Sequence, residues 1–368
     1  MTNELMNKSK QQDIKVKAIG YAILAALLYG ISSPFSKLLL VEIPPTLMAA
    51  LLYLGAGMGM LGVNILRVIT KKEQHEAKIT VKEMPYILGM IALDIAAPIL
   101  LMVGLTMTTS ANASLLNNFE IVATSLIAWL IFKETIGKRM WFAIILITIS
   151  SIILSFTDLS SFSFSIGSTF VLLACISWGF ENNCTRMLSL KDPLQIVVIK
   201  GFGSGIGSLI ISIVIQEYNF NWLYILLTLL LGFIAYGMSI FFYIKAQREL
   251  GAARTSAFYA AAPFIGVIVS WIILKEPITI TFIIALAIML LGTYYAVSEV
   301  HKHRHIHLEE THEHIHNHHD YDYDDHHDDY DNHNHDYDIK GEHSHIHNHE
   351  RLEHTHRHLP DLHHKHTH

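Results

Sequence analysis

Three acidic side chains lie in segments that are otherwise apolar and long enough to cross a bilayer: Asp94, Glu120 and Glu181. An ionisable group in the middle of a membrane span costs about 2.5–3.5 kcal/mol on insertion scales, so such residues mark functional sites by default. Asn117 lies three residues before Glu120, which places both on one face of a helix. An amide beside a carboxyl group offers oxygen ligands and a group that can gain or lose a proton. The acids are therefore candidate binding sites for a substrate or a proton.

Each acid also has a structural interpretation. Asp94 and Glu120 could stay neutral and hydrogen-bond a neighbouring helix, and Glu181 is close enough to the end of its segment to line a water-filled entrance. One base, Lys200, lies roughly 10 Å deep in the next segment, at about 1.5 Å per residue. We expect it to extend to the membrane interface rather than to pair with Glu181. Acids then outnumber bases, which favours a cationic cargo, or proton coupling with a neutral or zwitterionic one.

Tyrosines and amides in apolar segments are the remaining candidates for lining a cavity. Tyr243 and Arg254 belong to this wider group, and we expect Arg254 at the interface because it is near a helix start. The candidate substrate- or proton-binding residues are Asp94, Asn117, Asn118, Glu120, Glu181, Tyr236 and Tyr259.

Histidine forms the second set of chemically active residues. Of the 25 histidines, all but His75 follow residue 300, in a segment where His-x-His recurs among Asp and Glu. Imidazole suits Zn, Ni, Co and Cu, and the spacing specifies no single tetrahedral site. We predict a multi-site metal binder whose affinity falls as the pH drops through about 6.5; the alternative is a merely solvated tail. The predicted metal ligands are His303, His305, His307, His312, His314, His316, His318, His343, His345, His347, His349, His354, His356 and His358.

Ten apolar segments could hold these residues in a membrane. A span needs about 20 mostly apolar residues to cross a hydrocarbon core about 30 Å thick. With 51% hydrophobic residues, nearly all before residue 300, the chain predicts an all-α membrane protein of ten transmembrane helices. The predicted spans are 18–40, 44–66, 85–107, 110–132, 139–157, 167–188, 193–216, 222–245, 250–274 and 279–298.

Lys and Arg gather in the N-terminal segment and in alternate loops, whereas the odd-numbered loops are nearly free of them. The positive-inside rule then predicts that both termini lie in the cytoplasm. We expect the membrane to be the plasma membrane. The tail has few aliphatic residues and cannot bury a core, so we expect it to be disordered. The predicted units are a cytoplasmic N-terminus (1–17), two five-helix repeats (18–157 and 167–298) and a disordered His/Asp-rich cytoplasmic tail (299–368).

The two halves of the membrane part resemble each other. An aliphatic run ends in Lys133-Glu134 in the first half and in Lys275-Glu276 in the second, and Tyr29-Gly30 matches Trp178-Gly179. Lys37 matches Arg186 in the same alignment. Because each repeat has five spans, an odd number, the second repeat must be inverted relative to the first. Inverted repeats are typical of transporters, whose site lies at the midplane between the halves.

The three acids have no acidic counterpart in this repeat. Asp94 aligns with Tyr236, Glu120 with Ala262, and Glu181 with Ser32. They are therefore not part of a duplicated structural core, which favours a role in binding cargo or protons.

These features resemble the drug/metabolite transporter superfamily, EamA type, over about residues 18–298. The resemblance depends on the duplicated ten-span layout, the aromatic-Gly…Lys/Arg pattern, and the apolar-Lys-Glu endings, of which ILKEP at 273–277 is the most typical. It implies a secondary carrier of a small metabolite whose cavity is lined mainly by spans one, three, four, six, eight and nine. It names no substrate.

Three hypotheses follow. The first is a proton-coupled carrier of a small metabolite or cation with a metal-binding tail. The second is a carrier of divalent Ni, Co or Zn that uses the tail as receiver or sensor. The third is a membrane-anchored metal sensor without transport, which would not need a duplicated bundle. We expect no nucleic-acid partner, since no basic patch is interleaved with aromatics, no enzymatic activity and no required cofactor. A second copy of the chain is a candidate partner, beside the lipid bilayer.

Overall fold

The computed structural model describes the membrane part of the chain and four short segments of the tail. The described residues are 2–69, 81–133, 136–158, 163–188, 191–250, 255, 258–298, 301–307, 310–317, 342–349 and 352–358. For residues 2–15 and for the tail segments, the backbone alone is described.

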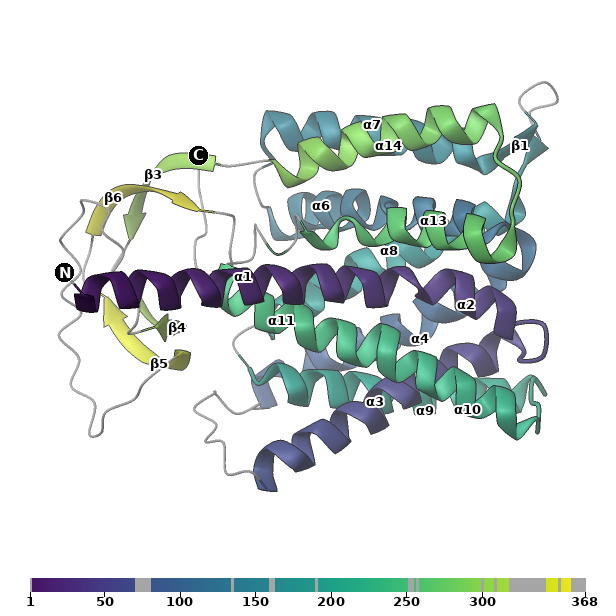
Figure 1. The fold of residues 1–368 in the computed structure, drawn as a ribbon, viewed down its shortest axis with the longest axis horizontal. Helices are drawn as coiled ribbons and strands as arrows, with labels where there is room; N and C mark the ends of the chain where they lie inside the picture. The colour runs from purple at the N-terminus through teal and green to yellow at the C-terminus, as the bar shows by residue number, and fades with distance from the viewer. Residues whose placement is uncertain are drawn as a thin grey trace.

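Helices make up both halves of the membrane part (Figure 1). The first half holds α1 (Thr2–Gly30), α2 (Ser32–Leu39), α3 (Pro45–Ile69), the short 3₁₀ turn η1 (Val81–Glu83), α4 (Met84–Met107), α5 (Ser110–Leu116), α6 (Phe119–Phe132) and α7 (Lys138–Ser155). A small pair of antiparallel strands, β1 (Phe156–Asp158) and β2 (Ser163–Phe164), leads into the second half. That half holds α8 (Ile166–Arg186), α9 (Pro193–Val214), α10 (Trp222–Leu231), the π-helix η2 (Gly232–Met238), α11 (Ser239–Leu250), α13 (Ala262–Leu274) and α14 (Ile280–Val297).

Each of the ten predicted spans contains at least one helix. Among the described residues, eight helical stretches are long and apolar enough to cross a membrane. The predicted sixth span is α8, which has the length but carries Glu181, Asn182, Asn183 and Arg186. The predicted ninth span contains α13, which has 13 residues, and its earlier part lies partly outside the described residues. The two deviations therefore fall on a polar helix and a short helix.

Helix packing follows a two-fold relation between the halves. The extensive contacts pair α3 with α9, α7 with α14, and α5 with α13, so the second, fifth and fourth spans of each half meet their own counterparts. Two further pairs are α4 with α8 and α1 with α11, which are the third span of one half against the first span of the other, in both senses. Exchanging the halves leaves this set of pairs unchanged. The two repeats thus form one bundle with the symmetry expected of inverted repeats.

Local backbone features are duplicated as well. Lys133 and Lys275 both end their helices in the left-handed conformation, with φ of 56° and 51°. This is a common way to end a helix, although glycine usually occupies the position. The Glu276 carboxylate accepts from the backbone N–H groups of Ser110 and Ala111, at 2.7 and 2.8 Å. It therefore caps the N-terminus of α5, where a negative charge is stabilised; Glu134, its counterpart, lies outside the described residues.

Glycines mark the places where helices approach most closely. A Cβ added to Gly201 would lie 2.5 Å from Cα of Gly57, so α3 and α9 cross in backbone contact. Gly30 packs against Ala262 and Ile265 in α13, and Gly179 packs against Ala123 and Thr124 in α6. Small residues allow such contact between membrane helices. The glycines in the repeat motifs therefore pack the spans together.

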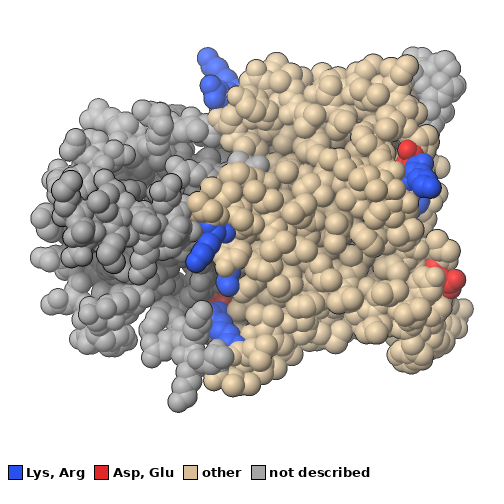
Figure 2. Space-filling model, in the orientation of Figure 1, with Lys and Arg blue, Asp and Glu red and all other residues tan. Residues whose placement is uncertain are grey.

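The sides of the bundle are apolar. On the face drawn in Figure 2, Lys, Arg, Asp and Glu lie at the two ends, and the surface between them carries none. Exposed apolar side chains of the bundle include Leu130, Ile213, Leu226 and Ile280. An exposed apolar band between charged ends fits a multi-pass membrane protein.

Within the tail that composition predicts to be disordered, the structure assigns extended backbone to four segments. These are β3 (His301–His307), β4 (Glu310–Asn317), β5 (Glu342–His349) and β6 (Leu352–His358), and they pair as β3 with β6 and β4 with β5. His-x-His repetition has the two-residue period of a strand. Disorder stays a prediction for the parts of the tail between and beyond these strands, which lie outside the described residues.

Candidate functional site

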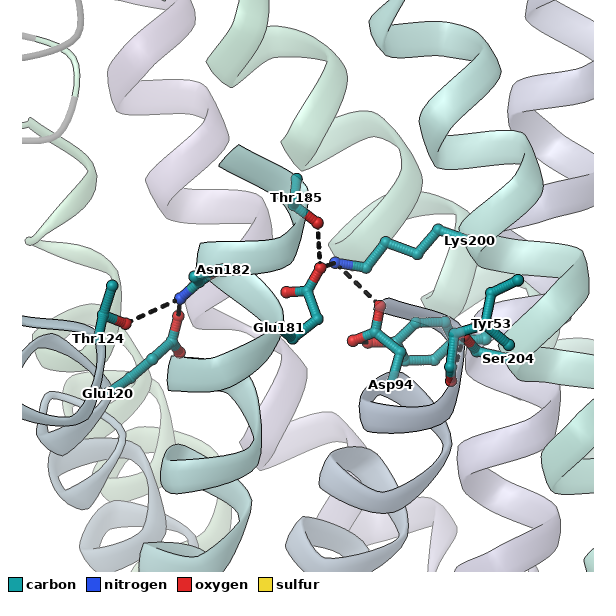
Figure 3. A network of polar contacts seen from close by, with 10 residues as sticks. Tyr53, Asp94, Glu120, Thr124, Glu181, Asn182, Thr185, Lys200 and Ser204 are labelled. Carbon is teal, nitrogen blue, oxygen red and sulfur yellow. Dashed lines mark hydrogen bonds and ion pairs between the residues drawn. The ribbon is translucent and has the colours of Figure 1, made fainter. Parts of the chain in front are cut away.

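A buried ion cluster joins three helices in the middle of the bundle. Nζ of Lys200, from α9, lies 3.0 Å from Oδ2 of Asp94 in α4 and 2.9 Å from Oε1 of Glu181 in α8. Asp94 and Glu181 have 0% and 1% of their surface exposed. Figure 3 shows the lysine reaching between the two carboxylates. The prediction that Lys200 extends to the interface is wrong, because two buried acids hold it inside the protein.

Hydroxyl groups donate further hydrogen bonds to the two carboxylates. Tyr53 in α3 donates to Oδ1 of Asp94 at 2.8 Å, and Thr185, one turn along α8, donates to Glu181. Buried charges need such partners, since an unpaired one is strongly destabilising. Glu181 therefore does not line a water-filled entrance: it is packed inside the ion cluster.

The neighbouring residue of α8 serves the third acid. Asn182 donates its Nδ2 to Oε1 of Glu120 at 2.6 Å and to Oγ1 of Thr124 at 3.2 Å, both on α6. In Figure 3, α8 separates the two groups: Glu181 is on the side of α4 and α9, and Asn182 is on the side of α6. The network contains three carboxyl groups and one ammonium group. A proton or a cation would compensate part of this excess of acid.

Asn117 and Glu120 both face α8, as their spacing predicts. The Sγ of Cys175 lies 4.0 Å from Oδ1 of Asn117, and Cys175 is two helical turns before Asn182, the partner of Glu120. The α-helical hydrogen bonding is interrupted between them, where α5 ends at Leu116 and α6 begins at Phe119. Asn117 and Asn118 keep right-handed helical dihedral angles, and the backbone N–H groups of Asn118, Glu120 and Ile121 bond three residues back, so the helix tightens here without unwinding. A similar turn, at Ala260 and Ala261, precedes α13 in the second half.

A small pocket lies beside this interruption, between the two halves. It is lined from spans one, three, four, eight and nine, by Tyr29, Gly30, Ser32, Ser33, Leu101, Ser114, Asn117, Tyr236, Ala262 and Pro263. Of the predicted binding residues, Asn117 and Tyr236 line it. The sixth span, which the resemblance adds to the cavity, contributes none of these side chains.

Tyrosines cluster on one side of the pocket. The ring of Tyr29 lies 6.0 Å from that of Tyr236 and 5.6 Å from that of Tyr259, and the Tyr259 hydroxyl lies 3.4 Å from Oγ of Ser239. Tyr259 therefore supports the pocket wall from behind Tyr29. Asn118 lies elsewhere: it donates to the carbonyl of Leu115 and accepts from Thr293 in α14.

The repeat alignment identifies a neutral counterpart of the ion cluster. Ser32 donates to the Tyr236 hydroxyl at 3.2 Å. These two residues occupy the positions that Glu181 and Asp94 occupy in the other half, on equivalent pairs of helices. One arrangement is thus a hydrogen bond in the pocket, and the other an ion pair bridged by Lys200. The repeat alignment matches Asp94 with Tyr236 and Glu181 with Ser32. Nothing in it indicated that Ser32 would contact Tyr236, or that Lys200 would bridge the two acids.

Some predicted residues lie outside the described part. Arg254 is one, and the side chains of all predicted histidine ligands are others. Among the side chains that the structure does describe, no group of three His, Cys, Asp or Glu residues is arranged to hold a metal ion. Tyr29, Ser32 and Tyr53 were not predicted as site residues. The aromatic-Gly motif at Tyr29 pointed to this region, as did the predictions of Asn117 and Tyr236.

Comparison with known proteins agrees with this architecture. A solved crystal structure aligns with a TM-score of 0.56 at 14% identity, covering 76% of this chain and 95% of its own, which shows the fold alone. A protein of Methanothermobacter thermautotrophicus (strain Delta H), described as an uncharacterized transporter, is 29% identical over 290 residues, which are 74% of this chain and 83% of that protein. The family model for EamA-like transporters matches twice, at residues 16–156 and 165–298, one match to each repeat. With both halves matched, the chain belongs to the EamA-like transporter family.

Proposed function

We propose that this member of the family is a secondary carrier of a small cation or metabolite, coupled to protons, and that it has no enzymatic activity. The observation that supports this most strongly is the buried network of three carboxyl groups with a single ammonium group beside the pocket between the repeats. Rocking of inverted repeats exposes such a pocket to each side in turn. A carboxyl group in the network can then take up a proton on one side and release it on the other.

Glu120 is the carboxyl group that fits the coupling role best. Asp94 and Glu181 share Lys200 and receive further hydrogen bonds, whereas Glu120 accepts from a neutral amide, Asn182. Among the described residues, no ammonium group forms an ion pair with this carboxyl group. Asn117, on the same face of the interrupted helix, connects this acid to the pocket.

Transport assays with purified protein in liposomes test the proposal. A panel of small amines and zwitterions is presented under an imposed pH gradient, with an internal pH-sensitive dye to follow protons. We expect at least one compound to enter together with proton movement, and the movement to disappear in Glu120→Gln. Uptake that is identical with and without the pH gradient would rule out coupling.

A divalent metal carrier is the second candidate, and the His-rich tail favours it. The same liposomes can be tested with Ni, Co and Zn, using the full chain and a chain that ends at Val300. Flux with both versions would make the tail regulatory, and flux with the full chain alone would make it part of the path. If no metal and no small molecule moves while the tail binds metal, the membrane-anchored sensor replaces both carriers.

The proposed location is the plasma membrane, with both termini in the cytoplasm. The distribution of Lys and Arg among the loops supports this orientation. Reporter fusions after residues 157 and 298 test it, because the two sites should face opposite sides of the membrane. Reporters on the same side would contradict the five-span repeat.

A further inference from the structure

The strand pairs of the tail place histidines directly opposite one another. In β3 and β6, the pairs are His301 with His358, His303 with His356, and His305 with His354. In β4 and β5, they are His312 with His347, His314 with His345, and His316 with His343. All predicted metal ligands except His318 belong to the strands of these two sheets. His301, which was not among the predicted ligands, belongs to β3 as well.

Both sheets follow one register. The last pair of β3 with β6 is His307 with Leu352, and the first pair of β4 with β5 is Glu310 with His349. Both members are displaced by three residues, so the two sheets keep the same register. A register displaced by one residue would set each histidine opposite another residue type. The observed pairing sets histidine against histidine at six positions, and a register displaced by two residues would keep histidines opposed as well.

The sequence contains an independent sign that the two histidine-rich segments match each other. In the segment that holds β3 and β4, the alternation of histidines is broken once, by a spacing of five residues between His307 and His312. In the segment that holds β5 and β6, the same spacing separates His349 and His354. Each break is an odd number of residues and shifts the alternation by one. In the register the two breaks overlap with an offset of two residues, so His307 faces Leu352, His349 faces Glu310, and the histidines on either side of the breaks remain opposed. Unrelated solvated repeats would have no reason to match in this way.

We propose that each sheet binds divalent transition metal, of the zinc, nickel or cobalt type, on its histidine face. Alternate residues of a strand share a face, and residues directly opposite have Cβ atoms about 4.5–5.5 Å apart. The next pair on that face is about 7 Å along the strand. Two successive pairs thus place four histidines at neighbouring positions of one face, and zinc takes four ligands, with Zn–N about 2.0–2.1 Å.

The two sheets differ in the charges around these pairs. The positions that alternate with histidine in β3 and β6 include Lys302, Arg304 and Arg357. Those in β4 and β5 include no Lys or Arg, and Glu310 continues the histidine alternation at its end. Nearby positive charge opposes the binding of a cation, and a carboxylate favours it. The sheet of β4 and β5 therefore holds metal more tightly than that of β3 and β6.

This inference refines the metal-binding tail of the proposed function. A tail that chelates without order depends on how many histidines it has, whereas a paired tail depends on where they are. The exchange of His314→Ile with Ile315→His keeps the composition and moves one histidine by one position. The same exchange at His305→Ile with Ile306→His tests the weaker sheet. His333→Asn with Asn334→His is the matched control, in a segment that lies outside the described residues.

Zinc binding is measured on the purified full chain in detergent, by competition with a chromogenic chelator. We expect the exchange at His314 to weaken the tightest zinc site at least tenfold, the exchange at His305 to weaken only the second site, and the control to leave both unchanged. Equal affinities in all variants, or an equal loss in the control, would overturn the ordered sites while leaving the tail a metal binder. If the full chain binds no more zinc than a chain ending at Ser298, the metal-binding tail itself fails.

Discussion

Nζ of Lys200 lies 2.9 Å from Oε1 of Glu181, and this contact connects the first two spans of the second repeat. The same ammonium group reaches Asp94, 3.0 Å away in the first repeat. The Lys200 side chain therefore connects the two halves through ion pairs. At the equivalent interface on the other side of the repeat, a hydrogen bond between Ser32 and Tyr236 joins the halves instead. The bundle is symmetric in its helices and asymmetric in its chemistry.

Replacing Lys200 by Met leaves two carboxyl groups buried without their common partner. Removing one member of a buried ion pair costs about 3–5 kcal/mol, so we expect a clear fall of the melting temperature in detergent. The double variant Lys200→Met with Glu181→Gln should recover part of the loss, because it removes one of the orphaned charges. Lys138→Met, at an exposed position, is the control. A single variant as stable as the control would show that the ion cluster does not hold the helices together.

Glu120→Gln should leave the fold intact and remove the response to the pH gradient. Asn182 can rotate its amide to hydrogen-bond the new side chain, so the contact between α6 and α8 is retained. Cargo uptake is measured with and without a gradient, beside Glu42→Gln, which alters an exposed acid. Proton movement that persists in Glu120→Gln but disappears in Asp94→Asn would transfer the coupling role to the ion cluster.

Tyr236→Phe should weaken cargo binding without unfolding the protein. The substitution removes the hydroxyl that accepts from Ser32 in the pocket. A neutral hydrogen bond contributes about 0.5–1.5 kcal/mol, so the KM for the cargo should rise by about two- to tenfold while the melting temperature changes little. Tyr294→Phe, on an exposed surface of α14, should behave as the wild type. An unchanged KM for Tyr236→Phe would place the cargo outside this pocket.

Gly201→Ala should destabilise the crossing of α3 and α9. The added methyl group would meet the backbone of Gly57 at 2.5 Å, and helix backbone cannot yield as a flexible side chain can. Overpacking of this kind costs about 1–3 kcal/mol. Gly62→Ala, in a position with no atom within 4 Å, should be neutral or slightly stabilising because alanine is the better helix former. Thermal unfolding in detergent compares the two, and equal melting temperatures would mean that the helices can separate at this point.

The sequence by itself determined the framework of this protein. Apolar runs of membrane length predict the spans because water-free surroundings force the backbone into helices. The Lys-Glu endings of the two halves predicted a repeat, and both lysines end their helices in the same left-handed conformation. Asp94, Glu120 and Glu181 stood out because an acid in an apolar span is costly, and all three belong to the polar network.

Tertiary structure alone decided which of these residues are partners. Lys200 could extend to the interface or turn inward, and the choice depends on acids from α4 and α8 that are far from it in sequence. The tightened turn at Asn117 and Asn118 contains neither Gly nor Pro, so the sequence did not reveal it. The pocket combines five spans, and no local pattern encodes which faces meet. Chemistry can be recognised one residue at a time, but a site depends on distances that only the packed bundle sets.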